Sequence, residues 1–151
     1  MKTQKSRLNK LPEKPRVGVG VIILRGKKLL MLKRRGSHGS GTWNLPGGHL
    51  EFGETIIKCV RREVFEETGL KVKESKVICV NEELNFIKSD NRHYITIGCV
   101  AKIKSGKTKL KELEKCEELG WFCLESLPKP LFLPSENILE CFKKGVISLA
   151  N

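Results

Sequence analysis

Apolar residues fall into short runs and alternating stretches of strand length, and this pattern predicts a domain built around a β-sheet. The first two stretches flank a polar turn over residues 25–28, with Gly26 at its tip, which predicts a hairpin. Two later stretches are joined by the polar residues 88–91. The predicted strands cover residues 17–24, 29–32, 77–86, 94–103 and 119–124.

Two segments between or after these strands have the periodicity of helices. An apolar stripe predicts a helix over about residues 55–68, with Gly69 placed to end it. A second helix is predicted from an N-cap at Ser135 to about Ile147. Residues 104–115 are rich in lysine and predict a loop. Helices alternating with this many strands predict an α/β domain, with a mixed sheet between helical layers.

The first predicted helix carries an unusual group of carboxylates. Glu63, Glu66 and Glu67 stand at i, i+3 and i+4 and therefore share one helix face, where like charges repel. A divalent cation would reverse the sign of that interaction, because hard cations bind carboxylate oxygens. The alternative is a solvated acidic face. It is disfavoured because five of the 17 acidic residues fall within residues 51–67 of a basic chain.

Glycines surround this helix and define a loop, a helix and a second loop. Gly47 and Gly48 follow a proline, a combination that permits close backbone approaches. Glu54 stands at the positive N-terminal end of the helix. Arg62 precedes Glu63 by one residue, so it can hold a carboxylate by charge-assisted hydrogen bonds or form an ordinary surface ion pair.

Residues 48–70, GHLEFGETIIKCVRREVFEETGL, resemble the signature of the Nudix hydrolases, enzymes that cleave nucleoside diphosphates linked to another moiety. The stretches PRVGVGVIIL, KRRGSHGSGTWNLPGGHLEFGE, HYIT and EKCEELGWF are similar to the MutT-like nucleotide triphosphate diphosphatase branch. The resemblance runs from about Pro15 to Leu127. It implies a Nudix-type α/β/α sandwich with a mixed, curved sheet. Residues 15–151 would form this single domain, after a flexible basic arm over residues 1–14.

The resemblance also implies roles for the carboxylate helix. Glu63 and Glu67 would be the chief ligands of Mg²⁺, for which Mn²⁺ can substitute. Glu66 would assist or position the attacking water, and the Gly48 carbonyl would complete the metal shell. Glu54, at the start of the helix, would bind the metal or orient a neighbouring group.

The general base stays open at this stage. In some members of the family it is a glutamate outside the signature, and Glu114, Glu117 and Glu118 are the candidates here, each of which could equally be a solvated charge. His38 and His93 could act in acid–base chemistry or contact the base, although a lone histidine is more often structural.

The substrate contacts are likewise implied by the resemblance. Arg34 is expected to contact phosphate, with Lys33 and Arg35 beside it. Trp43 and Trp121 could stack on a base or fill the core. The full set of expected substrate-binding residues is Arg34, Asn44, Leu45, Gly47, Thr96, Gly120 and Trp121.

Charge and composition limit the classes of binding partner that we expect. The net charge is +12, but the 29 lysines and arginines are spread along the chain and no RNA-binding motif is present, so specific nucleic-acid binding is not expected. No apolar run approaches the roughly 20 residues needed to span a bilayer. The six cysteines lack metal-site spacing, which predicts reduced core thiols in a cytoplasmic protein. A homodimer is left open.

The favoured hypothesis is a Mg²⁺-dependent pyrophosphohydrolase. It would cleave (deoxy)nucleoside triphosphates to monophosphate and pyrophosphate, and so sanitise or balance nucleotide pools. One alternative is hydrolysis of nucleoside diphosphate derivatives such as ADP-ribose or a sugar nucleotide. Another is a Nudix-like domain that binds or regulates without turnover, which the intact carboxylate set disfavours.

Overall fold

The structure, a computed structural model, describes residues 14–36 and 38–149. Most of the expected N-terminal arm therefore lies outside the described residues. In chain order the strands are β1 (Arg16–Arg25), β2 (Lys28–Arg34), β3 (Trp43–Asn44), β4 (Gly47–His49), β5 (Lys71–Glu83), β6 (Tyr94–Ser105) and β7 (Cys116–Cys123). The helices are α1 (Ile56–Thr68), α2 (Phe86–Asp90) and α3 (Leu133–Lys144).

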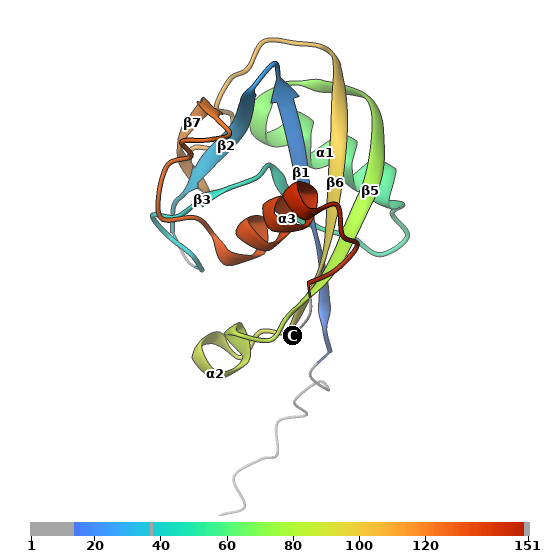
Figure 1. The fold of residues 1–151 in the computed structure, drawn as a ribbon, viewed down its shortest axis with the longest axis vertical. Helices are drawn as coiled ribbons and strands as arrows, with labels where there is room; N and C mark the ends of the chain where they lie inside the picture. Colours follow the sequence, from blue (N-terminus) through green and yellow to red (C-terminus); the bar gives the residue numbers. More distant parts are fainter. Residues whose placement is uncertain (1–13, 37, 150–151) are drawn as a thin grey trace, which may run out of the picture.

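A mixed sheet organises the molecule (Figure 1). Its main path runs β3-β2-β1-β6-β5, while β4 pairs with β1 and β7 pairs with β2. The β1–β6 pair is parallel and the other ladders are antiparallel. Helices α1 and α3 cover opposite faces of the sheet. The expected α/β sandwich with a mixed sheet is confirmed.

Two apolar clusters fill the spaces on either side of β1. Val21 and Ile23 of this strand point toward α1, where they pack with Val60 and Val64. The intervening Ile22 points to the other face and joins the cluster that contains α3. Both faces of β1 are thus buried, which explains why the strand reads as a continuous apolar run. The first half of β1, which contains Gly18 and Gly20, pairs with β4.

The β5 strand differs from its prediction at both ends. It begins at Lys71, six residues before the expected start, and ends at Glu83. Its register against β6 shifts at three places, and such irregularities interrupt the alternation of apolar residues. Phe86, expected to finish the strand, instead begins α2, which ends at Asp90 before Asn91 in the left-handed conformation with φ 52°.

The start of α3 also corrects the prediction. The N-cap is Phe132, Pro134 lies in the first turn, and Ser135 is already inside the helix. The Ser135 hydroxyl accepts a hydrogen bond from the Leu45 N–H at 3.0 Å instead of capping its own helix. The helix ends at Lys144, because Gly145 adopts a left-handed conformation, before the expected end at Ile147.

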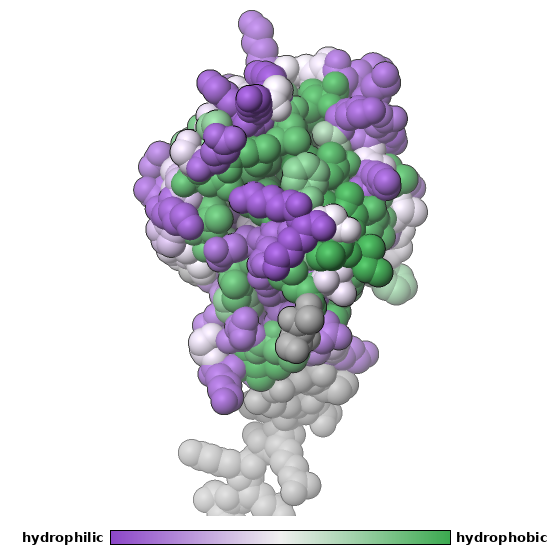
Figure 2. Space-filling model, viewed as in Figure 1, coloured by the Kyte–Doolittle hydropathy of each residue, from purple (hydrophilic) through white to green (hydrophobic). Residues whose placement is uncertain are grey.

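The loop before β7, the cysteines and the molecular surface can also be compared with the sequence predictions. The loop expected over residues 104–115 covers residues 106–115, because Lys104 and Ser105 extend β6. All six cysteines are unpaired, and five of them are buried. On the face that carries α3, polar side chains are interspersed with apolar ones (Figure 2). Over the part of the chain that the structure describes, no helix is long and apolar enough to cross a membrane.

Candidate active site

The side chain of Arg62 is the hub of the carboxylate cluster on α1. Its Nε and Nη2 atoms donate to the two oxygens of Glu54 at 2.8 and 2.9 Å. Its Nη1 atom donates to Glu63 at 2.6 Å and lies 3.4 Å from Glu66. The hydrogen bonds from Arg62 lower the pKa of Glu54 to about 2. Arg62 therefore holds three carboxylates in fixed positions, which favours the orienting role over that of a surface ion pair.

Glu63 and Glu67 point inward and are both buried, whereas Glu66 is exposed. Burial raises the pKa of Glu67 to about 8, with the neighbouring Glu63 charge adding to the effect and the Gly47 N–H opposing it. Burial also raises the pKa of Glu63, although Arg62 acts in the other direction. Buried carboxyl groups with raised pKa values are typical of functional sites.

Gly47 and Gly48 bring β4 against both β1 and α1. A Cβ atom at Gly47 would overlap the Val19 carbonyl, and one at Gly48 would overlap the Glu63 carboxylate. The Gly47 N–H donates to Glu67 Oε2 at 3.0 Å. Gly47 is therefore required because β4 lies against the backbone of β1, and a side chain at Gly48 would displace the Glu63 carboxylate.

The three signature glutamates do not converge as the sequence predicted. Glu63 and Glu66 turn toward Arg62, and Glu67 turns toward Gly47. Within residues 14–36 and 38–149, no three His, Cys, Asp or Glu side chains are grouped closely enough to hold a metal ion. The donor chemistry nevertheless fits a hard divalent cation, because two buried carboxylates and exposed Glu66 supply oxygen ligands.

A fifth carboxylate, which sequence reasoning missed, comes from the loop after β6. Glu112 accepts a hydrogen bond from Lys115 at 3.2 Å, while its Oε2 atom is buried without a hydrogen-bond partner. Its charge contributes to raising the pKa of both Glu63 and Glu67, so it lies near enough to act on both carboxylates. This placement depends on backbone contacts between the loop and the end of α1, such as Lys111 N–H to Glu67 O at 3.3 Å. No local pattern in the sequence reveals it.

The expected candidates for the base are placed differently. Glu117 and Glu118 pair with Lys33 at 3.3 and 3.0 Å on the β2–β7 ladder. Glu114 is exposed. Lys33 is thus engaged with carboxylates, and Arg35 donates to the Leu113 carbonyl at 2.9 Å. The structure brings neither of these two cations into the cavity described next.

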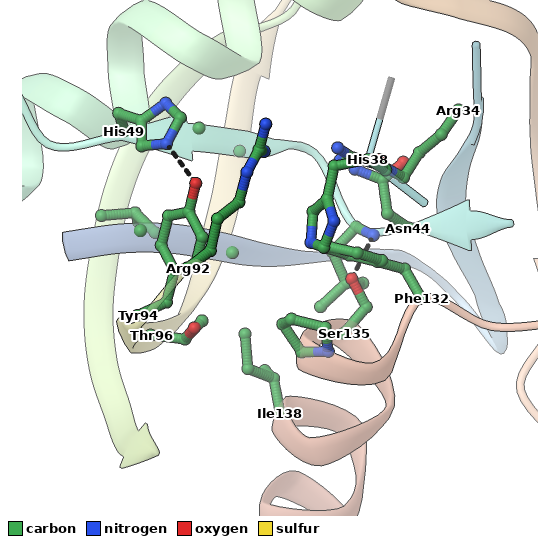
Figure 3. A pocket seen from close by; sticks show the side chains of 17 residues that line it. Arg34, His38, Asn44, His49, Arg92, Tyr94, Thr96, Phe132, Ser135 and Ile138 are labelled. Carbon is green, nitrogen blue, oxygen red and sulfur yellow. Dashed lines mark hydrogen bonds between the residues drawn. The ribbon is translucent and has the colours of Figure 1, made fainter. Parts of the chain in front are cut away.

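A cavity of about 220 Å³ begins at Gly48 and extends between β1, β6 and the start of α3 (Figure 3). It brings together most of the substrate-binding residues expected from the sequence, namely Arg34, Asn44, Leu45, Gly47 and Thr96. Gly120 and Trp121 are not among its lining residues. Trp121 instead donates to Thr108 at 3.2 Å and packs beneath the Arg25 guanidinium, whose Cζ atom lies 4.3 Å from the ring centroid.

The cavity is also lined by His38, which the sequence offered as a possible contact to the base, and by His49 and Tyr94 from stretches that resemble the family. Arg92, Phe132 and Ser135 come from segments that the sequence did not connect with the site. His49 and the Tyr94 hydroxyl are 3.2 Å apart, as the dashed line in Figure 3 shows. Arg34 donates to the His38 carbonyl at 2.9 Å, and its Cζ atom lies 4.2 Å from the centre of the Phe132 ring. The cavity therefore combines cationic and aromatic groups.

Comparison with known proteins agrees with this geometry. Residues 14–142 match the Nudix domain family. An ADP-ribose pyrophosphatase of Methanocaldococcus jannaschii is 35% identical over 118 residues, which are 78% of this chain and 68% of that protein. The mouse 8-oxo-dGDP phosphatase NUDT18 is 32% identical over 117 residues, 76% of this chain but only 34% of that protein.

Among solved structures, a MutT Nudix hydrolase from Burkholderia pseudomallei superposes with a TM-score of 0.80 at 34% identity. The match covers 85% of this chain and 98% of that one. Buried carboxylates beside a cationic, aromatic cavity define an α/β enzyme for a phosphorylated ligand. The chain belongs to the Nudix family, and it is a Nudix hydrolase that acts on phosphoanhydride bonds of nucleotide derivatives.

Proposed function

We propose that this Nudix hydrolase cleaves (deoxy)nucleoside triphosphates between the α and β phosphates, giving monophosphate and pyrophosphate. The observation that carries the proposal is the continuity of the cavity, which joins Gly48, beside Glu63, to Arg34 and Arg92 and to an aromatic end. A triphosphate carries about four negative charges, more than one divalent cation offsets, so cationic side chains near the carboxylates are useful.

The proposed metal is Mg²⁺, with Mn²⁺ as a substitute, as is typical of the family. Glu63, Glu67 and Glu66 would hold it together with the Gly48 carbonyl. When bound, it would offset charge on the phosphoryl oxygens and lower the pKa of a bound water. The existing carboxylate cluster, with two buried and mutually repelling glutamates, supports this assignment.

The remaining chemistry is assigned to side chains around the cluster. Arg62 holds Glu54 and Glu63 in place, so that both carboxylates keep their orientation during the reaction. Arg34 and Arg92 bind and orient the phosphate chain from the cavity side. Glu112 is assigned as the proton acceptor for the attacking water, because its charge acts on Glu63 and Glu67 and its buried Oε2 atom has no hydrogen-bond partner.

A second candidate function is hydrolysis of ADP-ribose, favoured by the similarity to the Methanocaldococcus enzyme. The test is to measure kcat/KM with Mg²⁺ for GTP, dGTP, dCTP, oxidised dGTP and ADP-ribose in parallel, with a chelator control. Faster turnover of at least one triphosphate than of ADP-ribose supports the proposal. Turnover of ADP-ribose alone assigns the second function, and binding without any turnover would leave a regulatory domain.

A further inference from the structure

His38 occupies an unusual position in the loop between β2 and β3. Its side chain is only 8% exposed and is enclosed by aromatic rings. The ring centroid lies 4.4 Å from that of Phe86 on α2 and 5.3 Å from that of Phe132. The same ring lines the cavity, as Figure 3 shows. The imidazole is therefore fixed in orientation at the cavity wall.

Asp90 determines which nitrogen of His38 carries the proton. Nδ1 of His38 is 2.8 Å from Oδ2 of Asp90, and a carboxylate can only accept a hydrogen bond. In the neutral ring Nδ1 is thus the donor and Nε2 is an acceptor. Burial lowers the pKa of His38, and the nearby Arg92 charge adds to this effect, so the neutral ring is favoured.

The acceptor that results is unused. Nε2 of His38 is buried and has no hydrogen-bond partner. Asn44, which lines the same cavity and is 7% exposed, also has an unpartnered buried oxygen, Oδ1. Nearly all buried polar atoms in proteins are hydrogen-bonded, and an unpaired one is costly. Two such acceptors in one cavity indicate a ligand that brings two donors.

The size and lining of the cavity restrict that ligand further. Pockets that enclose whole drug-sized ligands usually measure roughly 300–1,000 Å³. A cavity of about 220 Å³ fits one part of a nucleotide, and its aromatic lining fits a planar ring. Guanine is the common base with two donor atoms side by side on one edge, its ring N1–H and its amino group. Adenine and cytosine present a single donor atom beside an acceptor, and uracil presents one donor between two acceptors.

We propose that His38 and Asn44 are specificity-determining residues that accept two hydrogen bonds from the base, so that the cavity selects guanine nucleotides, with Asp90 positioning His38. This inference rests on the proposed function only in placing a nucleobase in the cavity. Its test is therefore equilibrium binding, which needs no turnover.

The experiment compares GMP with IMP by isothermal titration calorimetry. The two ligands differ only in the amino group, so IMP leaves one buried acceptor unpaired. We expect GMP to bind roughly tenfold more tightly than IMP to the wild-type protein, and also more tightly than AMP and UMP. Equal affinities for GMP and IMP would overturn the inference.

Variants then show which side chains produce the preference for GMP over IMP. His38→Phe keeps an aromatic ring between Phe86 and Phe132 but removes the acceptor, and Asn44→Leu removes the other one. The ratio of IMP to GMP dissociation constants should fall toward one in at least one of these variants. It should be retained in His93→Phe, a matched histidine control whose side chain is not among the cavity-lining residues. An unchanged ratio in both His38→Phe and Asn44→Leu would contradict the assignment.

The positioning role of Asp90 has its own readout. Asp90→Leu should weaken GMP binding with little change in melting temperature, because Asp90 is exposed. Asp90→Asn should restore it, since the amide oxygen still accepts from Nδ1–H. Guanine selectivity without any triphosphate turnover would sustain this inference and refute the proposed function. Triphosphate turnover with equal binding of GMP and IMP would refute this inference and leave the proposed function standing.

Discussion

Arg62 binds Glu54 through two parallel hydrogen bonds, from Nε to Oε1 at 2.8 Å and from Nη2 to Oε2 at 2.9 Å. A third nitrogen, Nη1, is left to bind Glu63 at 2.6 Å. Only a guanidinium offers this fork, because a lysine ammonium is a point charge without planar geometry. Glu54, before the start of α1, and the buried Glu63, about two turns into the helix, are thereby linked through one side chain.

The first prediction follows from this fork. Arg62→Lys keeps the charge but cannot bind Glu54 with two bonds and Glu63 with a third. We expect kcat/KM to fall about tenfold or more, equivalent to about 1.4 kcal/mol of transition-state stabilisation. Arg61→Lys is the matched control, since Arg61 is exposed and its contact to the Lys73 carbonyl is long, at 3.5 Å. Equal losses in both variants would contradict the role of Arg62.

A second prediction concerns the contact between Gly48 and Glu63. In Gly48→Ala the new methyl group overlaps the Glu63 carboxylate, which must then move. We expect Mn²⁺ affinity, measured by electron paramagnetic resonance titration, to fall about tenfold or more, a range that lost metal-site orientation commonly produces. Gly18→Ala is the control, because no atom lies within 4 Å of its added Cβ atom. Unchanged affinity in Gly48→Ala would exclude Glu63 from the metal site.

A third prediction concerns the pH dependence of stability without metal. The folded pKa of Glu67 is raised by burial from 4.5 to about 8. Between these values the folded protein keeps a proton that the unfolded chain has released, so the free energy of unfolding falls as pH rises. Glu67→Gln removes this dependence.

The measurement is the melting temperature of chelator-treated protein at about pH 5 and about pH 8. The difference between Glu67→Gln and wild type should shift in favour of the variant at the higher pH. Glu66→Gln, at an exposed neighbouring position, should track the wild type at both values. A pH-independent difference for Glu67→Gln would show that Glu67 ionises normally in the folded protein.

A fourth prediction separates Glu112 from its neighbour Glu114. Glu112→Gln should lower kcat by about 10²-fold or more, the usual contribution of a general base. Glu114→Gln should keep kcat within about twofold of the wild-type value. Loss of activity in Glu114→Gln with retention in Glu112→Gln would reverse the assignment. The comparison is well matched because both residues lie in the same loop.

The sequence predicted the carboxylate helix and the mixed sheet because both depend on local information. Thr55 caps α1 by accepting from the Lys58 N–H at 3.2 Å, and Gly69 ends it in the left-handed conformation with φ 76°. The apolar run of β1 reflects burial on both faces. The early start of β5 was missed because shifts in register break its two-residue period.

The cavity could be predicted only in part. Arg34, Asn44 and Thr96 were expected from family resemblance, and the structure brings them together. Trp121 was placed with them, yet the ladder between β2 and β7 pairs it with Leu30, on the side of the core that faces α1. His38 was one of two histidines offered as possible base contacts, but its partner Asp90 is more than 45 residues away in sequence, so no local pattern distinguished it from His93.

The most direct test of the account is product analysis by phosphorus NMR of wild-type protein with dGTP and Mg²⁺. The account predicts monophosphate and pyrophosphate in equal amounts, no turnover in excess chelator, and a loss of orders of magnitude in rate for Glu63→Gln. Orthophosphate as the sole phosphate product, or full turnover in chelator, would contradict it.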